Sequence, residues 1–163
     1  MKELILVRHA KSSWKLDDCP DFYRPLNERG YREAPVLARR LATEDSAPHT
    51  ILTSPAVRAY STALFLRSAW MLPWDQLAIA PPVYEATAGN LLDWLAAEER
   101  PEKVVVVGHN PGLSDLFAWL TAADAPELRT ACAVALSLHP TTPLERGTAR
   151  LTAGWDGRPS APA

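Results

Sequence analysis

The chain has 163 residues, with 17 lysines and arginines against 19 aspartates and glutamates and a formal net charge of -2. This balance argues against a protein that binds nucleic acid, because such proteins carry a strongly basic domain or stripe. Hydrophobic residues make up 47% of the chain, yet no apolar run approaches the roughly 20 residues of a membrane span. The sequence therefore predicts neither a nucleic-acid partner nor a membrane partner.

The first residues and the cysteines indicate the compartment. Met1-Lys2-Glu3 leads directly into a strand-like run, without the pattern of a signal peptide. Cys19 and Cys132 are too few and too far apart for a disulfide framework or a cysteine-based metal site. We expect a cytoplasmic protein, and a redox or metal-binding function is disfavoured.

Short apolar runs alternate with helical patterns along the chain, which is typical of a layered α/β fold. The expected elements, in chain order, are strand 4–7, helix 27–42, strand 50–53, helix 54–70, strand 77–80, helix 91–98, strand 104–107, helix 111–120 and strands 133–138 and 149–155. Asn27 is the predicted N-cap of the first helix. Ser54, followed by Pro55, is the predicted N-cap of the second.

The run of four valines at 104–107 is apolar at every position, so helices should cover this strand on both faces, as in a parallel sheet. The short connection between 133–138 and 149–155 predicts an antiparallel pair. Together these patterns predict a three-layer α/β/α sandwich with a mostly parallel central sheet. Residues 1–155 are expected to form a single domain, and residues 156–163 a flexible C-terminal tail.

Two histidines and two arginines are predicted to meet at one edge of this sheet, because ligands of open α/β sheets bind beyond the carboxyl ends of the strands. The first strand ends in Arg8-His9, and the valine strand ends in Gly108-His109-Asn110. The second strand ends in Ser54, with Arg58 in the first turn of the helix that follows. There the helix dipole disfavours a cation by roughly 0.3–1 kcal/mol, which predicts an anion between Arg58 and the helix N-terminus.

This set of side chains predicts a site for a phosphoryl dianion that also contains a nucleophile. Guanidinium groups bind phosphate oxygens bidentately, and a neutral imidazole attacks phosphorus when an acceptor holds its other nitrogen. Arginine and imidazolium would supply the positive charge that Mg²⁺ brings in other phosphoryl-transfer sites. No cofactor and no metal are expected, since no pattern such as His-Glu-x-x-His joins His9 to His109. If neutral His9 attacks, the rate should fall on the acid side as the ring protonates.

Four segments resemble the histidine phosphatase superfamily, which has the phosphoglycerate-mutase-like fold. They are Leu6-Val7-Arg8-His9-Ala10-Lys11-Ser12, Arg24-Pro25-Leu26-Asn27-Glu28-Arg29-Gly30, Thr53-Ser54-Pro55-Ala56-Val57-Arg58-Ala59 and Val107-Gly108-His109-Asn110-Pro111-Gly112. The opening segment and the small size are most similar to the SixA-type phosphohistidine phosphatase branch. Many members have glycine where this chain has Ala10, which alanine can replace if the backbone there has a negative φ.

The resemblance implies a catalytic role for His9 as the nucleophile that becomes phosphorylated. It implies that Arg8, Arg58 and His109 complete the phosphate pocket. It also implies a proton-donating carboxylate after the third strand, for which Glu85 is the candidate, although a surface glutamate fits that position equally well. The further candidates for contact with the phosphate are Ser12, Ser54 and Asn110.

The function predicted from these features is a metal-independent phosphatase that acts through a phosphohistidine intermediate, with protein phosphohistidine as the substrate. The stretch 67–85 is short, so the pocket should be shallow and open, which suits a phosphorylated side chain on another protein. The alternatives are a phosphatase of a small phosphorylated metabolite and a non-catalytic phosphate-binding module, which the presence of His9 disfavours. A mutase is disfavoured because it needs a lid over its intermediate.

Overall fold

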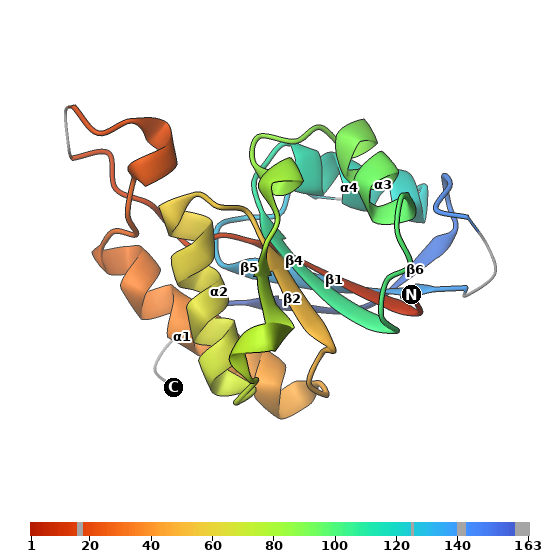
Figure 1. The fold of residues 1–163 in the computed structure, drawn as a ribbon, viewed down its shortest axis with the longest axis horizontal. Helices are drawn as coiled ribbons and strands as arrows, with labels where there is room; N and C mark the ends of the chain where they lie inside the picture. Colours follow the sequence, from red (N-terminus) through yellow and green to blue (C-terminus); the bar gives the residue numbers. More distant parts are fainter. Residues whose placement is uncertain (16–17, 125, 140–142, 159–163) are drawn as a thin grey trace.

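The computed structural model describes residues 1–15, 18–124, 126–139 and 143–158 (Figure 1). Within these residues, one sheet of six strands has the order β3-β2-β4-β1-β5-β6. The strands are β1 (Glu3–Arg8), β2 (Thr50–Thr53), β3 (Leu77–Ile79), β4 (Lys103–Gly108), β5 (Cys132–Leu138) and β6 (Ala149–Asp156). Strands β3, β2, β4 and β1 are parallel, whereas β5 is antiparallel to β1 and β6 to β5. The predicted mostly parallel sheet and the predicted antiparallel pair are both confirmed.

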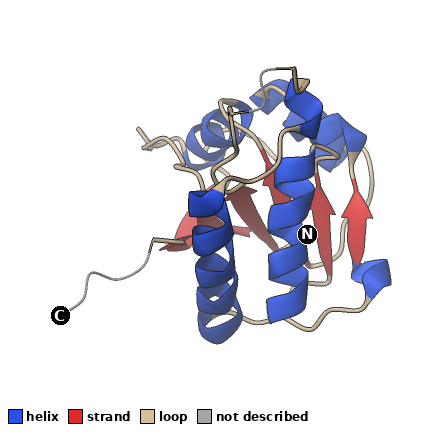
Figure 2. Ribbon diagram, turned by 90° about the vertical axis from the view of Figure 1, so that its left-hand side faces the viewer, coloured by secondary structure: helices blue, strands red, loops and turns tan. Residues whose placement is uncertain are grey.

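Helices cover both faces of the sheet, so the predicted three-layer sandwich is also confirmed (Figure 2). The helices are α1 (Glu28–Glu44), α2 (Val57–Ala69), α3 (Ala88–Ala96) and α4 (Gly112–Thr121), with single 3-10 turns η1 (Asp21–Tyr23), η2 (Trp74–Gln76) and η3 (Pro81–Val83). No helix in the described ranges is long and apolar enough to cross a bilayer.

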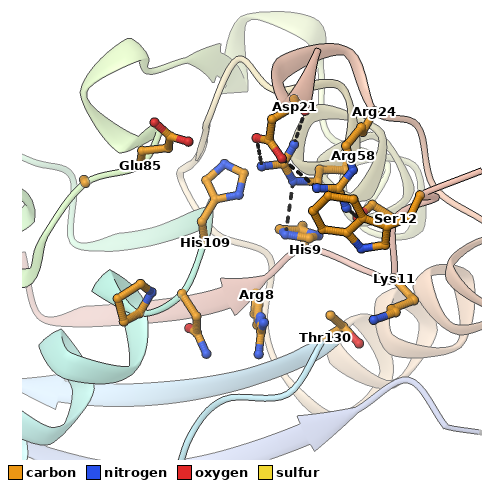
Figure 3. Close-up of a pocket in the computed structure, with 14 residues that line it drawn as sticks. Arg8, His9, Lys11, Ser12, Asp21, Arg24, Arg58, Glu85, His109 and Thr130 are labelled. Atoms are coloured by element: carbon orange, nitrogen blue, oxygen red, sulfur yellow. Dashed lines mark hydrogen bonds and ion pairs between the residues drawn. The ribbon is translucent and has the colours of Figure 1, made fainter. Parts of the chain in front are cut away.

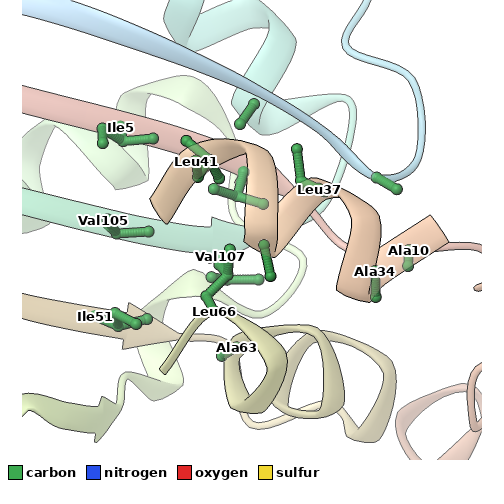
Figure 4. Close-up of a cluster of buried hydrophobic side chains, with 14 of the residues drawn as sticks. Ile5, Ala10, Ala34, Leu37, Leu41, Ile51, Ala63, Leu66, Val105 and Val107 are labelled. Carbon is green, nitrogen blue, oxygen red and sulfur yellow. The ribbon is translucent and has the colours of Figure 1, made fainter. Parts of the chain in front are cut away.

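The two faces of β1 and β4 belong to two separate hydrophobic clusters, because successive side chains of a strand point to opposite faces. The odd-numbered residues of 4–7 and 104–107 pack with apolar side chains of α1 and α2 (Figure 4). The even-numbered residues pack with α3 and α4. All eight side chains are fully buried, and each stabilises the fold by about 1.5–3 kcal/mol relative to exposure.

One of the two predicted N-caps is wrong, and α3 begins at Ala88 instead of at the predicted residue 91. Asn27 caps α1 as predicted, since its side-chain oxygen accepts a hydrogen bond from Gly30 N at 2.9 Å. Ser54 does not cap α2, which begins at Val57 after Ala56. The reason is that Ser54 still runs alongside β4, with its N–H donating to Val107 O at 2.9 Å.

The C-terminal boundary also differs from the prediction. Strand β6 includes Asp156, and Gly157 N donates to Ala131 O at 2.7 Å. A Cβ at position 157 would collide with the carbonyl oxygen of Glu33. Placing the start of the tail at residue 156 was therefore wrong, because the segment is packed through Gly157. Residues 159–163 of the predicted tail lie outside the described residues.

Gly112 brings the loop after η3 close to the start of α4. A Cβ at position 112 would collide with the carbonyl oxygen of Ala86. We expect Gly112→Ala to destabilise the protein by about 1–3 kcal/mol, as overpacked sites do, measured by urea unfolding.

The matched control is Gly89→Ala, at a helical position where a Cβ meets nothing closer than Thr87 Oγ1 at 3.9 Å. This change should stabilise the protein by about 0.5–1 kcal/mol, because alanine is the better helix former. Equal effects of the two substitutions would show that the contact with Ala86 is not tight.

Candidate active site

A cavity of about 450 Å³ lies beyond the carboxyl ends of β1 and β4 (Figure 3). Its lining residues are Arg8, His9, Lys11, Ser12, Trp14, Asp21, Arg24, Arg58, Glu85, Ala86, His109, Asn110, Pro111 and Thr130. Seven of the eight residues singled out from the sequence line it, and the exception is Ser54. The parallel sheet therefore brings the ends of its strands together as predicted.

The ring of His9 is held in the form that a nucleophile requires. Its Nδ1 lies 2.7 Å from Ala10 O, and a carbonyl oxygen only accepts hydrogen bonds, so Nδ1 carries the proton and Nε2 presents a lone pair. Burial lowers the pKa of His9 to about 4; the Ala10 hydrogen bond opposes this, and the charges of Arg58 and Arg8 add to it. At neutral pH the free protein thus has an uncharged, nucleophilic Nε2. Ala10 keeps a negative φ, so alanine fits there.

Arg58 is held by Asp21, a residue that the sequence analysis did not identify. Its Nη2 lies 2.7 Å from Asp21 Oδ2, its Nη1 donates to Asp21 O, and its Nε donates to His9 Nε2 at 3.3 Å. Burial raises the pKa of Asp21, but the hydrogen bond and charge of Arg58 outweigh it and hold the pKa below its usual value. In the free protein, the anion beside Arg58 is therefore the carboxylate of Asp21.

Arg24 ties the segment between β1 and α1 into one unit. Its Nη1 lies 2.6 Å from Asp21 Oδ1, its Nε donates to Ser13 O at 2.9 Å, and its Nη2 donates to Ser12 Oγ. The guanidinium also stacks on Trp14, 3.2 Å from the ring centroid. Arg24 belongs to the second segment that carries the family resemblance, which was the available signal for it.

His109 is neutral in the free protein rather than an imidazolium. Its ring centroid lies 5.0 Å from that of His9. Burial lowers the pKa of His109 to about 3, with further lowering by His9 and Arg58. The positive charge of the free cavity therefore does not reside on an imidazolium. A bound dianion would raise this pKa, because an opposite charge favours the protonated ring.

Ser54 lies behind His109 instead of facing the cavity. The side chain of Ser54 is fully buried, and its Oγ lies 2.7 Å from His109 Nε2. It also accepts a hydrogen bond from Ala56 N at 3.3 Å, which leaves the hydroxyl proton for the histidine. The expected contact between Ser54 and phosphate is therefore corrected to an orienting contact on His109.

Two residues that line the cavity each have a nitrogen without a hydrogen-bond partner among the described residues. These atoms are Arg8 Nε and His109 Nδ1, and both are buried. Leaving a buried polar group unsatisfied costs about 1–3 kcal/mol. Anionic oxygens would satisfy both nitrogens when each carries a proton, which fits a phosphoryl group.

Asn110 does not offer a donor to such an anion. Its Nδ2 donates to Glu127 Oε1 at 2.9 Å and to Leu128 O at 2.8 Å. Both partners are acceptors, so the orientation of the amide is fixed and its Oδ1 is the unpartnered atom. The expected contact between Asn110 and phosphate is not supported. Ser12 remains suited to it, since its hydroxyl accepts from Arg24 and keeps its own proton to donate.

Glu85 lines the cavity from an exposed loop after η3. In Figure 3 it lies on the His109 side of the cavity, away from His9. Its backbone has φ 50°, a left-handed conformation that residues other than glycine seldom adopt and that often marks a functional position. The described residues contain no group of three or more metal-binding side chains.

Comparisons with known proteins identify the family. The model of the histidine phosphatase superfamily (branch 1) matches residues 4–78. An uncharacterized protein of Picosynechococcus sp. is 36% identical over 124 residues, which cover 74% of this chain and 72% of that protein. The chain belongs to the histidine phosphatase superfamily.

Solved structures agree with this assignment. The SixA protein of Agrobacterium tumefaciens superposes with a TM-score of 0.82 at 26% identity, covering 94% of this chain and 97% of that one. A protein histidine phosphatase SixA in complex with tungstate has a TM-score of 0.79 at 22% identity, covering 95% and 97%. The fold of this chain is the SixA fold.

Two relatives carry the name of a different phosphatase. Phosphoserine phosphatase 1 of Hydrogenobacter thermophilus is 42% identical over 77 residues, which cover 42% of this chain and 33% of that protein. The metal-independent phosphoserine phosphatase of Arabidopsis thaliana is 31% identical over 105 residues, covering 61% and 43%. The chain spans less than half the length of either relative.

We predict that the rings of His9 and His109 stay neutral in the free protein from about pH 8 to about pH 5.5, well below the usual histidine range. Burial places their pKa values at about 4 and about 3. Between pH 6.5 and these lowered pKa values, the unfolded state binds more protons than the folded state. The free energy of unfolding should therefore fall as the pH drops through this range.

The measurement is an NMR titration, with His9→Asn and His109→Asn assigning the two ring signals. Addition of tungstate should raise at least one of the two pKa values. A ring that titrates near 6.5 in the free protein would contradict the buried, neutral state.

We predict that Asp21→Asn strengthens inhibition by inorganic phosphate. The carboxylate of Asp21 competes with phosphate for Arg58. Two unit charges 4 Å apart interact by roughly 1 kcal/mol in water and by more near a protein surface. Removing the repulsion between Asp21 and phosphate should therefore lower Ki about fivefold. The control is Asp18→Asn, an exposed carboxylate of the same segment. A rise in Ki for Asp21→Asn would mean that Asp21 serves mainly to hold Arg58 in place.

Proposed function

We propose that this protein is a metal-independent phosphatase that removes the phosphoryl group from phosphohistidine in proteins through a phosphorylated His9. The observation that carries the proposal is the state of His9. Its ring is buried and uncharged, its protonated Nδ1 donates a hydrogen bond to Ala10 O, and its Nε2 lone pair faces Arg58. A neutral imidazole in this tautomer is a competent nucleophile.

In the first step, Nε2 of His9 attacks phosphorus and the bond from phosphorus to the leaving nitrogen breaks. The leaving imidazole takes a proton, for which Glu85 is the proposed donor. Arg8 and Arg58 neutralise the charge on the phosphoryl oxygens, where electrostatic stabilisation matters most. His109, oriented by Ser54, takes up a proton as the dianion binds and adds a third positive charge.

In the second step, water attacks the phosphorus of phospho-His9 and the bond to Nε2 breaks. Glu85, deprotonated in the first step, accepts the proton of the water, and inorganic phosphate is released. Nδ1 of His9 keeps its proton throughout and donates it to Ala10 O as a hydrogen bond, so the ring leaves as a neutral imidazole and is ready for the next substrate. Arg58 again donates to Nε2, as in the free protein.

The surroundings of the cavity favour a macromolecular substrate. Trp14 and Tyr23, in the segment beside the cavity, are 72% and 61% exposed. Exposed aromatic side chains are typical of protein-binding surfaces. The SixA fold supports the same substrate class. The two relatives named as phosphoserine phosphatases support the alternative, a small phosphomonoester, and the cavity of about 450 Å³ has room for one.

The test measures phosphate release from a phosphohistidine peptide, phosphoserine and p-nitrophenyl phosphate, with EDTA present. We expect His9→Ala to lose activity by roughly 10³-fold or more, since the nucleophile is removed. His49→Ala, at an exposed histidine outside the cavity, serves as the control. Acid-labile phosphate on the wild-type chain, absent from His9→Ala, would identify the intermediate.

Other outcomes separate the alternatives. Release from the small esters but not from the peptide would assign a metabolite as the substrate. No release from any of the three, with tungstate binding intact, would favour a non-catalytic phosphate-binding module.

A further inference from the structure

A second cavity, of about 500 Å³, adjoins the first. The two cavities share Arg8, Lys11 and Thr130 as lining residues. The rest of the second lining consists of Arg29, Pro126, Glu127 and Arg129. A substrate whose phosphoryl group occupies the first cavity can therefore extend along this shared wall into the second.

The second cavity is strongly cationic, with four basic side chains against the single carboxylate of Glu127. Arg29 is paired with Glu33 at 2.7 Å, and Arg8 with Glu127 at 3.0 Å. In the described part of the chain, no carboxylate lies within ion-pair distance of Lys11 or Arg129. Two positive charges of this cavity thus remain available to a ligand.

The backbone that carries Arg129 and Thr130 is fixed on both sides. Before them, Leu128 N donates to Ser114 Oγ at 2.9 Å and Leu128 O accepts from Arg8 at 2.7 Å. After them, Ala131 has φ 54° and its N–H donates to His9 O at 3.2 Å. The Arg129 side chain therefore projects from a loop tied to β1 and α4.

Lys11 stands on an equally fixed backbone. Its carbonyl oxygen accepts from Asn27 N at 2.9 Å. Gly30 lets α1 approach this carbonyl so closely that any Cβ would collide with it. In Figure 3, Lys11 lies beside Thr130. Two cations and a hydroxyl are thus brought together by rigid segments, an arrangement that suits binding of a carboxylate or phosphate.

We infer that the second cavity is an anion subsite that takes a second negatively charged group of the same substrate. The inference rests on the proposed function and deepens it, because it specifies which phosphorylated molecules are preferred. In a protein substrate the second group is an acidic side chain next to the phosphohistidine. In a small phosphomonoester it is a carboxylate. Glu127 repels such a group and restricts it to the side of Lys11 and Arg129.

The test compares two phosphohistidine peptides that differ only in the flanking residues, which are Asp in one and Asn in the other. A second pair, phosphoserine and its carboxamide, tests a small-molecule source of the same charge. We expect the wild-type protein to favour the acidic member of at least one pair about fivefold in kcat/KM at low salt, mainly through KM. The pair that shows the preference identifies whether the second negative charge belongs to a protein substrate or to a small molecule.

The variant for this test is Arg129→Glu, which lies outside the first cavity. It should abolish or invert the preference for the acidic member and change turnover of the Asn peptide by less than twofold. The matched control is Arg150→Glu, at an exposed position of β6, which should leave the preference intact. Equal use of both members of both pairs by the wild-type protein, or a preference that survives Arg129→Glu, would overturn the subsite.

Binding separates failure of the subsite from failure of the proposed function. If no peptide is hydrolysed, the phosphatase proposal fails, and binding of the two peptides to the His9→Ala protein still reports on the subsite. Tighter binding of the Asp peptide, lost in the His9→Ala/Arg129→Glu protein, would support the subsite. Equal binding of both peptides, and of the two phosphoserine compounds, would refute it.

Discussion

The register of β1 on β4 is the constraint on which the active site depends. Glu3 pairs with Lys103 at one end and Arg8 with Gly108 at the other. Between these ends both strands are wholly apolar and buried on both faces, so a slip by one residue would move a charged end into the core, where an unpaired charge is costly. The register therefore fixes the strand ends next to each other, and His9 N donates to Gly108 O at 3.1 Å. The two histidines meet because the valine strand cannot shift.

The charge of the cavity is set by the arginines that surround the buried rings of His9 and His109. Burial and nearby arginines keep both histidines uncharged, so the positive charge of the free protein resides on guanidinium groups. Asp21 balances part of that charge by pairing with Arg58 and Arg24. A phosphoryl group that enters must share these guanidinium groups with Asp21, and its own charge favours protonation of His109. In the free protein, Asp21 thus neutralises part of the positive charge of the arginines. A bound phosphoryl group would take over part of that pairing.

The sequence predicted the sheet, its layers and seven cavity-lining residues, because strand ends of an apolar parallel sheet converge by geometry alone. It did not predict Asp21, which pairs with Arg58 across 37 positions from the single 3-10 turn η1, a segment too short to show periodicity. Ser54 and Asn110 were placed correctly on the chain, but their side chains point to His109 and to Glu127 instead of toward phosphate. Side-chain direction just after a strand depends on hydrogen bonds from other elements. The neutral state of His109 depends likewise on burial, which no local pattern encodes.

The contact of Gly157 with Ala131 has a consequence for where the working unit of this chain ends. Ala131 O accepts from Gly157 N, while Ala131 N donates to His9 O. Ala131 thus links the last described residues of the chain to the backbone of His9, the proposed nucleophile, and it follows directly on the loop that presents Arg129 and Thr130. Shortening the chain to residue 155 would leave the sheet almost whole yet remove this anchor. Gly157, two residues beyond the last apolar side chain of β6, therefore belongs to the packed part of the chain.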